Sequence, residues 1–288
     1  MEVKLIAMTD AVFDYGTYWR GHASNGPIGN RLSLVEVCNH AAKTCTSEDA
    51  GDLLEPGYIG EEFTPKWTNG LELGPLREAI RSGHESVLEH AVFTFEVKGV
   101  SRVLTHQLVR HRIASYSQQS QRYADMSEAA YIIPESIDKC LTPATPDGCP
   151  LNIEYVNAIR KCEEVYRKLV NAGINPEDAR YVLPNACTTN IIITMNAREL
   201  RHFFSLRCCE RAQWEIRELA NKMLKICKEV SPTIFEDAGP SCVRDGFCRE
   251  QMSCGRAPKL ERVIEIMDEI DGLADIRDMQ RTAERECH

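Results

Sequence analysis

Hydrophobic and polar side chains alternate along parts of the chain, and this two-residue period predicts β-strands. Apolar side chains occupy every second position between residues 91 and 97, as expected for a strand with one buried face. Residues 188–195 (TTNIIITM) are rich in β-branched side chains, which favour a buried strand. Weaker patterns predict strands at residues 3–8 and 131–133. Gly99 is expected to end the strand that begins at residue 91.

Apolar residues recur every three to four positions in longer segments, and this spacing predicts amphipathic helices. Ser33, with Glu36 three residues later, has the pattern of a capping box. Ser101 is expected to cap a helix that carries residues 110–112 at its C-terminal end. The predicted helices cover residues 33–45, 75–81, 101–112, 153–172, 196–207, 212–230 and 260–281.

A change in composition after residue 235 divides the chain. Residues 236–288 combine glycine, cysteine and charged side chains with the last predicted helix. Residues 48–73 mix glycine, proline and acidic side chains without a clear period, so we interpret them as an insertion of unassigned role. The simplest organisation is one domain, residues 1–235, followed by a cysteine-containing loop and a charged helical tail.

Residues 110–123 (RHRIASYSQQSQRY) begin with three adjacent cationic or titratable side chains and continue with a polar run. No Asp or Glu occurs between Glu96 and Asp125. A protein core does not hold such charges unpaired. The three side chains therefore face water, pair with a carboxylate from a distant part of the chain, or bind an external anion. A phosphate suits the last case, because guanidinium groups match its oxygens.

The overall charge limits the classes of partner. The chain of 288 residues has 43 acidic and 34 basic side chains, a net charge of −9. This balance argues against a general nucleic-acid binder but allows a focused basic pocket for a small anion. We see no apolar run long enough to span a membrane and no signal-peptide pattern at the N-terminus, so we expect a cytoplasmic protein that binds neither membrane nor nucleic acid.

The chain contains 13 cysteines, which we expect to be reduced thiols rather than a disulfide framework. Most stand singly in apolar surroundings and read as small buried hydrophobic residues. Cys242, Cys248 and Cys254 are spaced C-x5-C-x5-C, which matches no common zinc-binding pattern, so we predict no metal site. Whether these three bind a metal or form disulfides stays open.

Arg110-His111-Arg112, seven further residues and Ser120 resemble the RHR-x7-S signature of the flavin-dependent thymidylate synthases. The resemblance extends over roughly residues 80–235, and the blocks that carry it are GHESVLEHAVFTF (83–95), DARYVLP (178–184) and NARELRHFFSLRCCERAQWEI (196–216). It implies an α+β fold with a twisted, mostly antiparallel sheet, long flanking helices and a helical C-terminal appendage.

The resemblance also implies an activity. Members of this family methylate dUMP to dTMP with methylenetetrahydrofolate as carbon donor, FAD as redox carrier and NADPH as reductant. They need no cysteine nucleophile, and they form homotetramers whose active sites draw residues from several subunits. All of these ligands are anionic, which agrees with an arginine-rich stretch that lacks acids.

Residue roles are carried over position by position from the resemblance. The positions expected to contact FAD are Ser86, Arg110, His111, Arg112, Gln118, Asn196, Arg198 and His202. Those expected to bind dUMP are Gln107, Arg110, Gln118, Gln119, Ser120, Gln121, Arg122, Arg180 and Arg207. His84 and Tyr123 are weaker candidates near the folate and nicotinamide. Arg207 is the expected catalytic residue, because a fixed cation beside the uracil favours its electron-rich, deprotonated form.

Some of these positions depart from the family pattern or admit other interpretations. Some relatives carry an acid at position 118 and Asn at position 202, where this chain has Gln118 and His202. Ser120 reads as a phosphate ligand rather than a nucleophile, because no adjacent general base is visible. Two rival functions remain, a basic-loop protein that recognises RNA or a phosphorylated partner and a flavin or nucleotide enzyme with another reaction.

Overall fold

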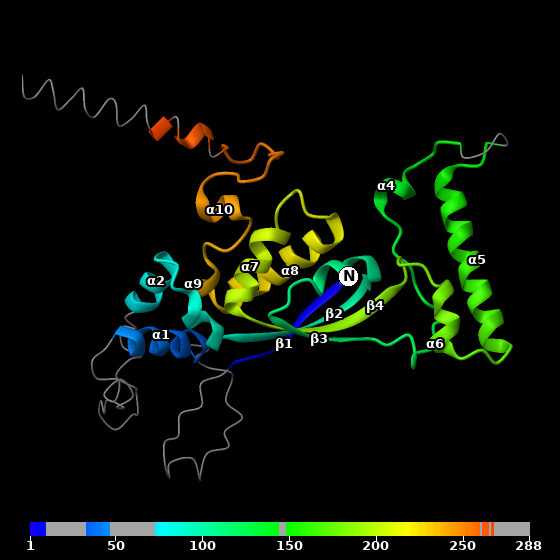
Figure 1. Ribbon diagram of the computed structural model, residues 1–288, viewed down its shortest axis with the longest axis horizontal. Helices are drawn as coiled ribbons and strands as arrows, with labels where there is room; N and C mark the ends of the chain where they lie inside the picture. Colours follow the sequence, from blue (N-terminus) through cyan, green and yellow to red (C-terminus); the bar gives the residue numbers. More distant parts are fainter. Residues whose placement is uncertain (10–32, 47–72, 144–147, 260, 265, 268–288) are drawn as a thin grey trace, which may run out of the picture. The chain divides into compact units, whose positions relative to one another are not determined.

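A computed structural model describes residues 1–9, 33–46, 73–143, 148–259, 261–264 and 266–267 (Figure 1). The chain divides into two compact units, Met1–Leu200 and Arg201–His288. The predicted domain boundary at residue 235 stays a prediction. Nearly all of the predicted insertion and most of the predicted helix 260–281 lie outside the described residues.

The first unit is built on an antiparallel sheet, which has four strands in the described part of the chain, in the order β1-β2-β4-β3. The strands are β1 (Glu2–Met8), β2 (Val92–Ser101), β3 (Ala114–Gln118) and β4 (Thr188–Asn196). Phe95 of β2 pairs with Leu5 of β1 and Ile193 of β4. Phe95 and Ile193 are fully buried, and burial of each such side chain stabilises the fold by roughly 1.5–3 kcal/mol. The predicted α+β class with a mostly antiparallel sheet is confirmed.

The prediction that Gly99 ends its strand is wrong. β2 continues to Ser101, and its register with β4 shifts between Val97 and Val100. Gly99 lies within this irregularity with φ of +68°, a left-handed conformation that glycine adopts without strain. Its N–H donates to Oδ1 of Asn190, 3.2 Å away, so the irregularity leaves that backbone group satisfied.

The sequence pattern also missed β3 and overestimated a strand at residues 131–133. β3 (ASYSQ) is polar, but its backbone pairs with β4 along its whole length at the edge of the sheet. Tertiary pairing thus overrides a weak intrinsic preference. At residues 131–133 only an isolated bridge forms, between Tyr131 and Cys187.

The helices of the first unit follow the predicted pattern, with one important difference at a boundary. They are α1 (Ser33–Thr46), α2 (Gly74–Arg81), η3 (Glu85–His90), α3 (Arg102–Leu108), α4 (Glu135–Asp138), α5 (Leu151–Asn171), α6 (Pro176–Ala179) and η4 (Arg180–Val182). Ser101 caps α3 as predicted, since its Oγ accepts from the N–H of Leu104. However, α3 ends at Leu108, so residues 110–112 lie in the turn that leads to β3. The Ser33 and Glu36 side chains of the predicted capping box lie outside the described ones.

The second unit contains the C-terminal part of α7 (Ala197–Arg207), followed by α8 (Trp214–Val230), α9 (Pro232–Phe235) and α10 (Ser241–Asp245). Phe203, Phe204 and Phe235 are fully buried, and their rings contact one another with centroid distances of 5.8 and 6.0 Å. The buried Arg201 guanidinium donates to both carboxylate oxygens of Asp237, at 2.6 and 3.0 Å. Phe203 and Phe204 are therefore core residues of the second unit.

Candidate functional site

The turn between α3 and β3 places the three residues of the RHR motif in different surroundings. Arg110 and Arg112 are exposed, and their side chains make no ion pair within the described residues. His111 points inward and is only 4% exposed, and its Nδ1 lies 3.1 Å from Oε1 of Glu199, which is 6% exposed. Two of the three options left open by the sequence therefore occur together: the arginines face water, and the histidine pairs with a distant carboxylate.

Tyr116 holds this turn in place from β3. Its hydroxyl group lies 2.9 Å from the carbonyl oxygen of Leu108 and 2.8 Å from that of His111, and it donates towards both. Burial, and secondarily the charge of Glu199, raises the pKa of Tyr116, so the hydroxyl stays protonated. The turn is thus fixed by the edge strand, whichever ligand approaches Arg110 and Arg112.

The start of α7 carries two more groups that the sequence singled out. Oδ1 of Asn196 accepts from the N–H of Glu199 at 2.9 Å, which is the geometry of a helix cap and fixes where the Glu199 carboxylate points. Arg198 is exposed and its NH1 lies 2.5 Å from Oε1 of Glu89 on η3. The helix start therefore presents a carboxylate inward to the RHR turn and a guanidinium outward to η3.

A second group of predicted residues gathers beyond the far end of β3. Arg122 binds both carboxylate oxygens of Glu177, with distances of 2.8 Å from Nε and 3.1 Å from NH2. Arg180 donates from Nε to the Glu177 carbonyl oxygen at 3.0 Å. Oγ of Ser120 accepts from the Arg122 N–H at 3.1 Å, which leaves the hydroxyl proton available to a ligand. We call Ser120, Arg122, Glu177 and Arg180 the Arg122 cluster.

The glutamines of the motif differ in exposure. Gln118 is half-buried, and its Nε2 donates to the hydroxyls of Thr105 and Thr189 at 3.2 and 3.4 Å. Gln121 is buried and donates to Sγ of Cys187 at 3.7 Å. Gln119 is exposed, whereas Gln107 is half-buried on α3 and its carbonyl oxygen accepts from the Arg110 N–H. Among these four glutamines, Gln107 and Gln119 make no side-chain hydrogen bond within the described residues, so their amides are the more available to a ligand.

Arg102 contacts Gln119 and was not identified as a candidate from the sequence. Its NH2 donates to the carbonyl oxygen of Gln119 at 3.0 Å, while its buried Nε has no hydrogen-bond partner. Burial lowers the pKa of Arg102, and the nearby charge of Arg180 lowers it further. The only sequence signal was its position directly after the cap Ser101. Glu199 and Glu177, the carboxylate partners of His111 and Arg122, were missed for a similar reason, because they are distant in sequence.

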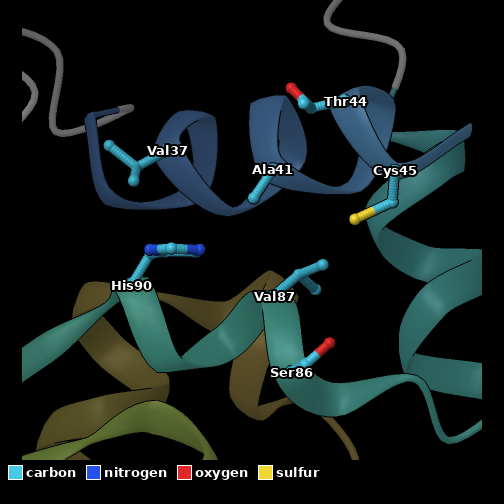
Figure 2. A pocket seen from close by; sticks show the side chains of 7 residues that line it. All are labelled: Val37, Ala41, Thr44, Cys45, Ser86, Val87 and His90. Carbon is cyan, nitrogen blue, oxygen red and sulfur yellow. The ribbon is translucent and has the colours of Figure 1, made fainter. Parts of the chain in front are cut away.

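A cavity of about 400 Å³ lies between α1 and η3. Figure 2 shows the His90 ring on η3 facing Val37 and Ala41 of α1, with Ser86 on the η3 side. The residues that line it are Val37, Ala41, Thr44, Cys45, Ser86, Val87 and His90. Its apolar walls with a few polar groups are typical of small-molecule sites. Ser86 is the only residue of the predicted flavin set in this lining. His84 is exposed in the turn before η3.

The remaining predicted residues occupy exposed or terminal positions. Tyr123 is exposed, and the guanidinium of Arg122 lies 5.5 Å from its ring centroid. His202 is exposed and Arg207 half-buried, and both lie in the part of α7 that belongs to the second unit. Within the first unit the structure thus forms three separate groups: the RHR turn, the Arg122 cluster and the α1–η3 cavity. No helix among the described residues is long and apolar enough to cross a membrane.

Comparisons of the sequence with known proteins point to one family. The family model described as "Thymidylate synthase complementing protein" matches residues 34–233. The flavin-dependent thymidylate synthase of Geobacter sulfurreducens is 54% identical over 195 residues, 67% of this chain and 80% of that protein. The Clostridium tetani enzyme of the same name is 46% identical over 260 residues, 82% of this chain and 97% of its own length. The one from Pyrococcus horikoshii is 47% identical over 227 residues, 75% of this chain and 90% of that protein.

Proposed function

Because this chain belongs to the family of the flavin-dependent thymidylate synthases, we propose that it forms dTMP by reductive methylation of dUMP. In this proposal methylenetetrahydrofolate supplies the carbon unit and NADPH supplies the reducing equivalents. FAD, when bound, supplies the hydride chemistry that completes the methyl group. The structural observation that supports the proposal most directly is the pair of exposed guanidinium groups, Arg110 and Arg112, on either side of the buried His111.

The residues present fit an anionic flavin cofactor. Arg110 and Arg112 have no carboxylate partner among the described residues, so a pyrophosphate can pair with them without displacing an internal ion pair. Ser86 presents a hydroxyl in a largely apolar cavity, as a planar, apolar ring system with polar edges requires. We propose the flavin contacts Ser86, Arg110, His111, Arg112, Gln118, Asn196, Arg198 and His202.

The Arg122 cluster fits the phosphate of dUMP. Arg122 and Arg180 converge on Glu177, and the Ser120 hydroxyl adds a donor beside them. A dianionic phosphate that approaches Arg122 competes with the Glu177 carboxylate, so binding exchanges one ion pair for another. We propose that Gln107, Gln118, Gln119 and Gln121 complete the dUMP site with the Ser120, Arg122 and Arg180 side chains.

Arg207 is proposed as the catalytic residue. A guanidinium beside the uracil stabilises the negative charge that develops on the ring when C5 becomes nucleophilic. In this role the guanidinium acts as an electrostatic group and not as a proton donor. The assignment rests on family membership and on the position of Arg207 within the family block at residues 196–216.

We also propose a homotetramer with shared active sites. β3 has five residues and therefore separates the RHR turn from the Arg122 cluster by roughly 14 Å. If two copies of the chain associate, the RHR turn of one copy and the Arg122 cluster of the other can contact the same nucleotide. Large apolar side chains are exposed around both groups, as expected for a surface that another subunit covers. They are Val103, Val109, Ile113, Tyr123 and Tyr181.

The visible spectrum of the purified protein, titrated with dUMP and NADPH, tests the function. A flavin spectrum that is bleached by NADPH, with dTMP formed only when methylenetetrahydrofolate is also present, supports it. A colourless protein that does not take up FAD would favour the RNA- or phosphopeptide-binding alternative. A flavoprotein that leaves dUMP unchanged would point to a different flavin reaction.

A further inference from the structure

Five cysteines line one small cavity in the second unit. The cavity has a volume of about 30 Å³, enough for an ion or a single water molecule but not for an organic ligand. Two of the cysteines follow α7 and three come from residues 242–254. The residues that line it are Cys208, Cys209, Glu210, Arg211, Pro240, Ser241, Cys242, Cys248, Glu250, Cys254 and Arg256.

Contacts outside the thiols hold these segments together. NH1 of Arg256, two residues after Cys254, lies 2.7 Å from the Oε1 atom of Glu210, the residue after Cys209. The backbone N–H of Cys248 donates to the Pro258 carbonyl oxygen at 2.7 Å, which closes the loop that contains Cys254. The convergence of the cysteines is therefore a property of the local fold and not of one side-chain rotamer.

A second contact fixes the segment that bears Cys242. Asp245, at the end of α10, accepts from Nε of Arg244 at 2.8 Å and from Nε of Arg249 at 2.9 Å. The carboxylate thus ties the turn after Cys242 to the residue that follows Cys248. Gly246, with φ of +75°, ends α10 in the left-handed conformation and reverses the chain between these two cysteines.

Burial of apolar side chains does not explain what holds residues 236–259 in their conformation. Between residues 236 and 259 the buried apolar side chains are Ala238 and Cys248, while Val243 is 60% and Met252 65% exposed. A segment with so small a core is ordinarily held by disulfides or by a structural metal ion. The cysteines of the described residues all have free thiols.

We propose that Cys209, Cys242, Cys248 and Cys254 bind one Zn²⁺ ion that holds the region after α9 in place. Four thiolates in a tetrahedron are a common ligand set of structural zinc. Binding releases the thiol protons to solvent. No three His, Cys, Asp or Glu side chains of the described residues already stand in ligand geometry, so the thiols must close on the ion. Cys254 is exposed and Cys209 and Cys242 are half-buried, which leaves their side chains room to rotate.

Cys208 is left out of the ligand set. It lines the same cavity but is only 5% exposed, so its side chain has little room to rotate towards an ion. Cys209 is more accessible and is the neighbour of Glu210, which contacts the loop of Cys254 through Arg256.

Charge favours a metal ion over a reactive disulfide pair. Cysteines that form regulatory disulfides are exposed and have a depressed pKa. Cys248 is instead buried and Cys242 half-buried, and their thiols line one small cavity together with those of Cys209 and Cys254. Thiolates gathered so closely repel one another, and a divalent cation removes that repulsion. The guanidinium groups of Arg211 and Arg256, which also line the cavity, offset the negative charge that four thiolates and one Zn²⁺ leave.

Metal analysis of the purified full-length protein tests the proposal independently of the enzymatic reaction. We expect about one zinc per chain in the parent protein and in the control variant Cys140→Ser, which changes a half-buried cysteine of the first unit. Each of the variants Cys209→Ser, Cys242→Ser, Cys248→Ser and Cys254→Ser should lose most of the zinc. Iron in place of zinc, or zinc retained by all four variants, would overturn the assignment.

Thiol labelling of the parent protein keeps the test decisive if a variant folds poorly. Cys254 and Cys45 are both exposed, so without metal both should react with iodoacetamide under reducing conditions. With zinc bound, we expect Cys254 to be protected until a chelator is added, whereas Cys45 reacts in either case. Equal labelling of Cys254 before and after addition of the chelator would contradict a zinc site.

Discussion

Nδ1 of His111 lies 3.1 Å from Oε1 of Glu199, and both side chains are almost completely buried beneath the RHR turn. Because the residues on either side of His111 are exposed, the motif is divided between an internal histidine–carboxylate pair and two exposed arginines. The internal pair holds the turn, and the exposed arginines remain available to ligands.

The Glu199→Gln substitution should destabilise the protein. It removes a carboxylate that accepts from a buried imidazole, and an inadequately paired buried polar group costs about 1–3 kcal/mol. Urea denaturation measures the change in the free energy of unfolding. The matched control is Glu89→Gln, which breaks the exposed pair with Arg198 and should cost at most about 1 kcal/mol. If both substitutions lower the free energy of unfolding equally, the buried pair stabilises the protein no more than the exposed pair does.

The Glu177→Gln substitution should strengthen binding of dUMP. The Glu177 carboxylate competes with the phosphate for Arg122, and an exposed ion pair contributes at most about 1 kcal/mol, so the dissociation constant should fall by no more than about fivefold. Calorimetry with dUMP measures the change. The control Asp178→Asn removes the same charge from the neighbouring exposed position. If both variants bind dUMP equally, the effect comes from overall charge and not from competition at Arg122.

The Arg207→Ala substitution should abolish most turnover and leave flavin binding intact. Loss of one electrostatic group at the reacting centre lowers kcat by about 10²–10³-fold. The dTMP formation rate and the flavin absorbance per chain are the two measurements. Arg167→Ala, which removes an exposed guanidinium on α5, should leave both unchanged. Parent-like turnover of Arg207→Ala would remove the catalytic role proposed for this residue.

Acid should weaken the second unit through Asp237. The hydrogen bonds from Arg201 hold the pKa of this carboxyl below its ordinary value of 3.8. Because this pKa is lower in the folded state, ionised Asp237 stabilises the fold fully when the pH is above the pKa of the unfolded state. That stabilisation is lost as the pH falls through the pKa of the folded state. Thermal unfolding followed from pH 6 to pH 2 should therefore show a steeper loss below about pH 4 in the parent than in Asp237→Asn. Parallel curves would contradict this linkage.

The Arg102→Met substitution should weaken binding of dUMP more than it lowers stability. Methionine keeps much of the aliphatic stem but removes the donor that holds the Gln119 carbonyl, next to Ser120. Loss of a hydrogen bond from a charged group, about 1.5–3 kcal/mol, corresponds to a rise in the dissociation constant of roughly 10- to 150-fold. Lysine at this position keeps a donor and should restore part of the affinity. An unchanged affinity in Arg102→Met would show that Arg102 only supports the fold.

Local patterns predicted the elements whose neighbours lie along the chain, and they failed where the partner is distant. The alternation at Phe93 and Phe95 identified β2, and Ser101 identified the start of α3. β3 was not predicted because its polar residues acquire strand geometry only by pairing with β4, 73 to 81 positions away. The end of α3 was placed too late because the turn at His111 depends on Glu199 and not on local propensity.

The same reasoning explains which part of the site could be read from the sequence. The arginines stood out because they are adjacent and lack nearby acids. Their partners did not, since Glu177 and Glu199 are ordinary acidic positions on helices until the fold brings them to Arg122 and His111. Cys209 likewise gained a possible role only when the fold placed it beside the C-x5-C-x5-C segment.

The hydroxyl of Tyr116, held between the carbonyl oxygens of Leu108 and His111, has a consequence for the thermodynamics of ligand capture. A loop that is already rigid loses little conformational entropy when a nucleotide arrives. Phenylalanine at position 116 would keep the ring and free the turn, so affinity would drop through a less favourable binding entropy, although no atom that touches the ligand has changed.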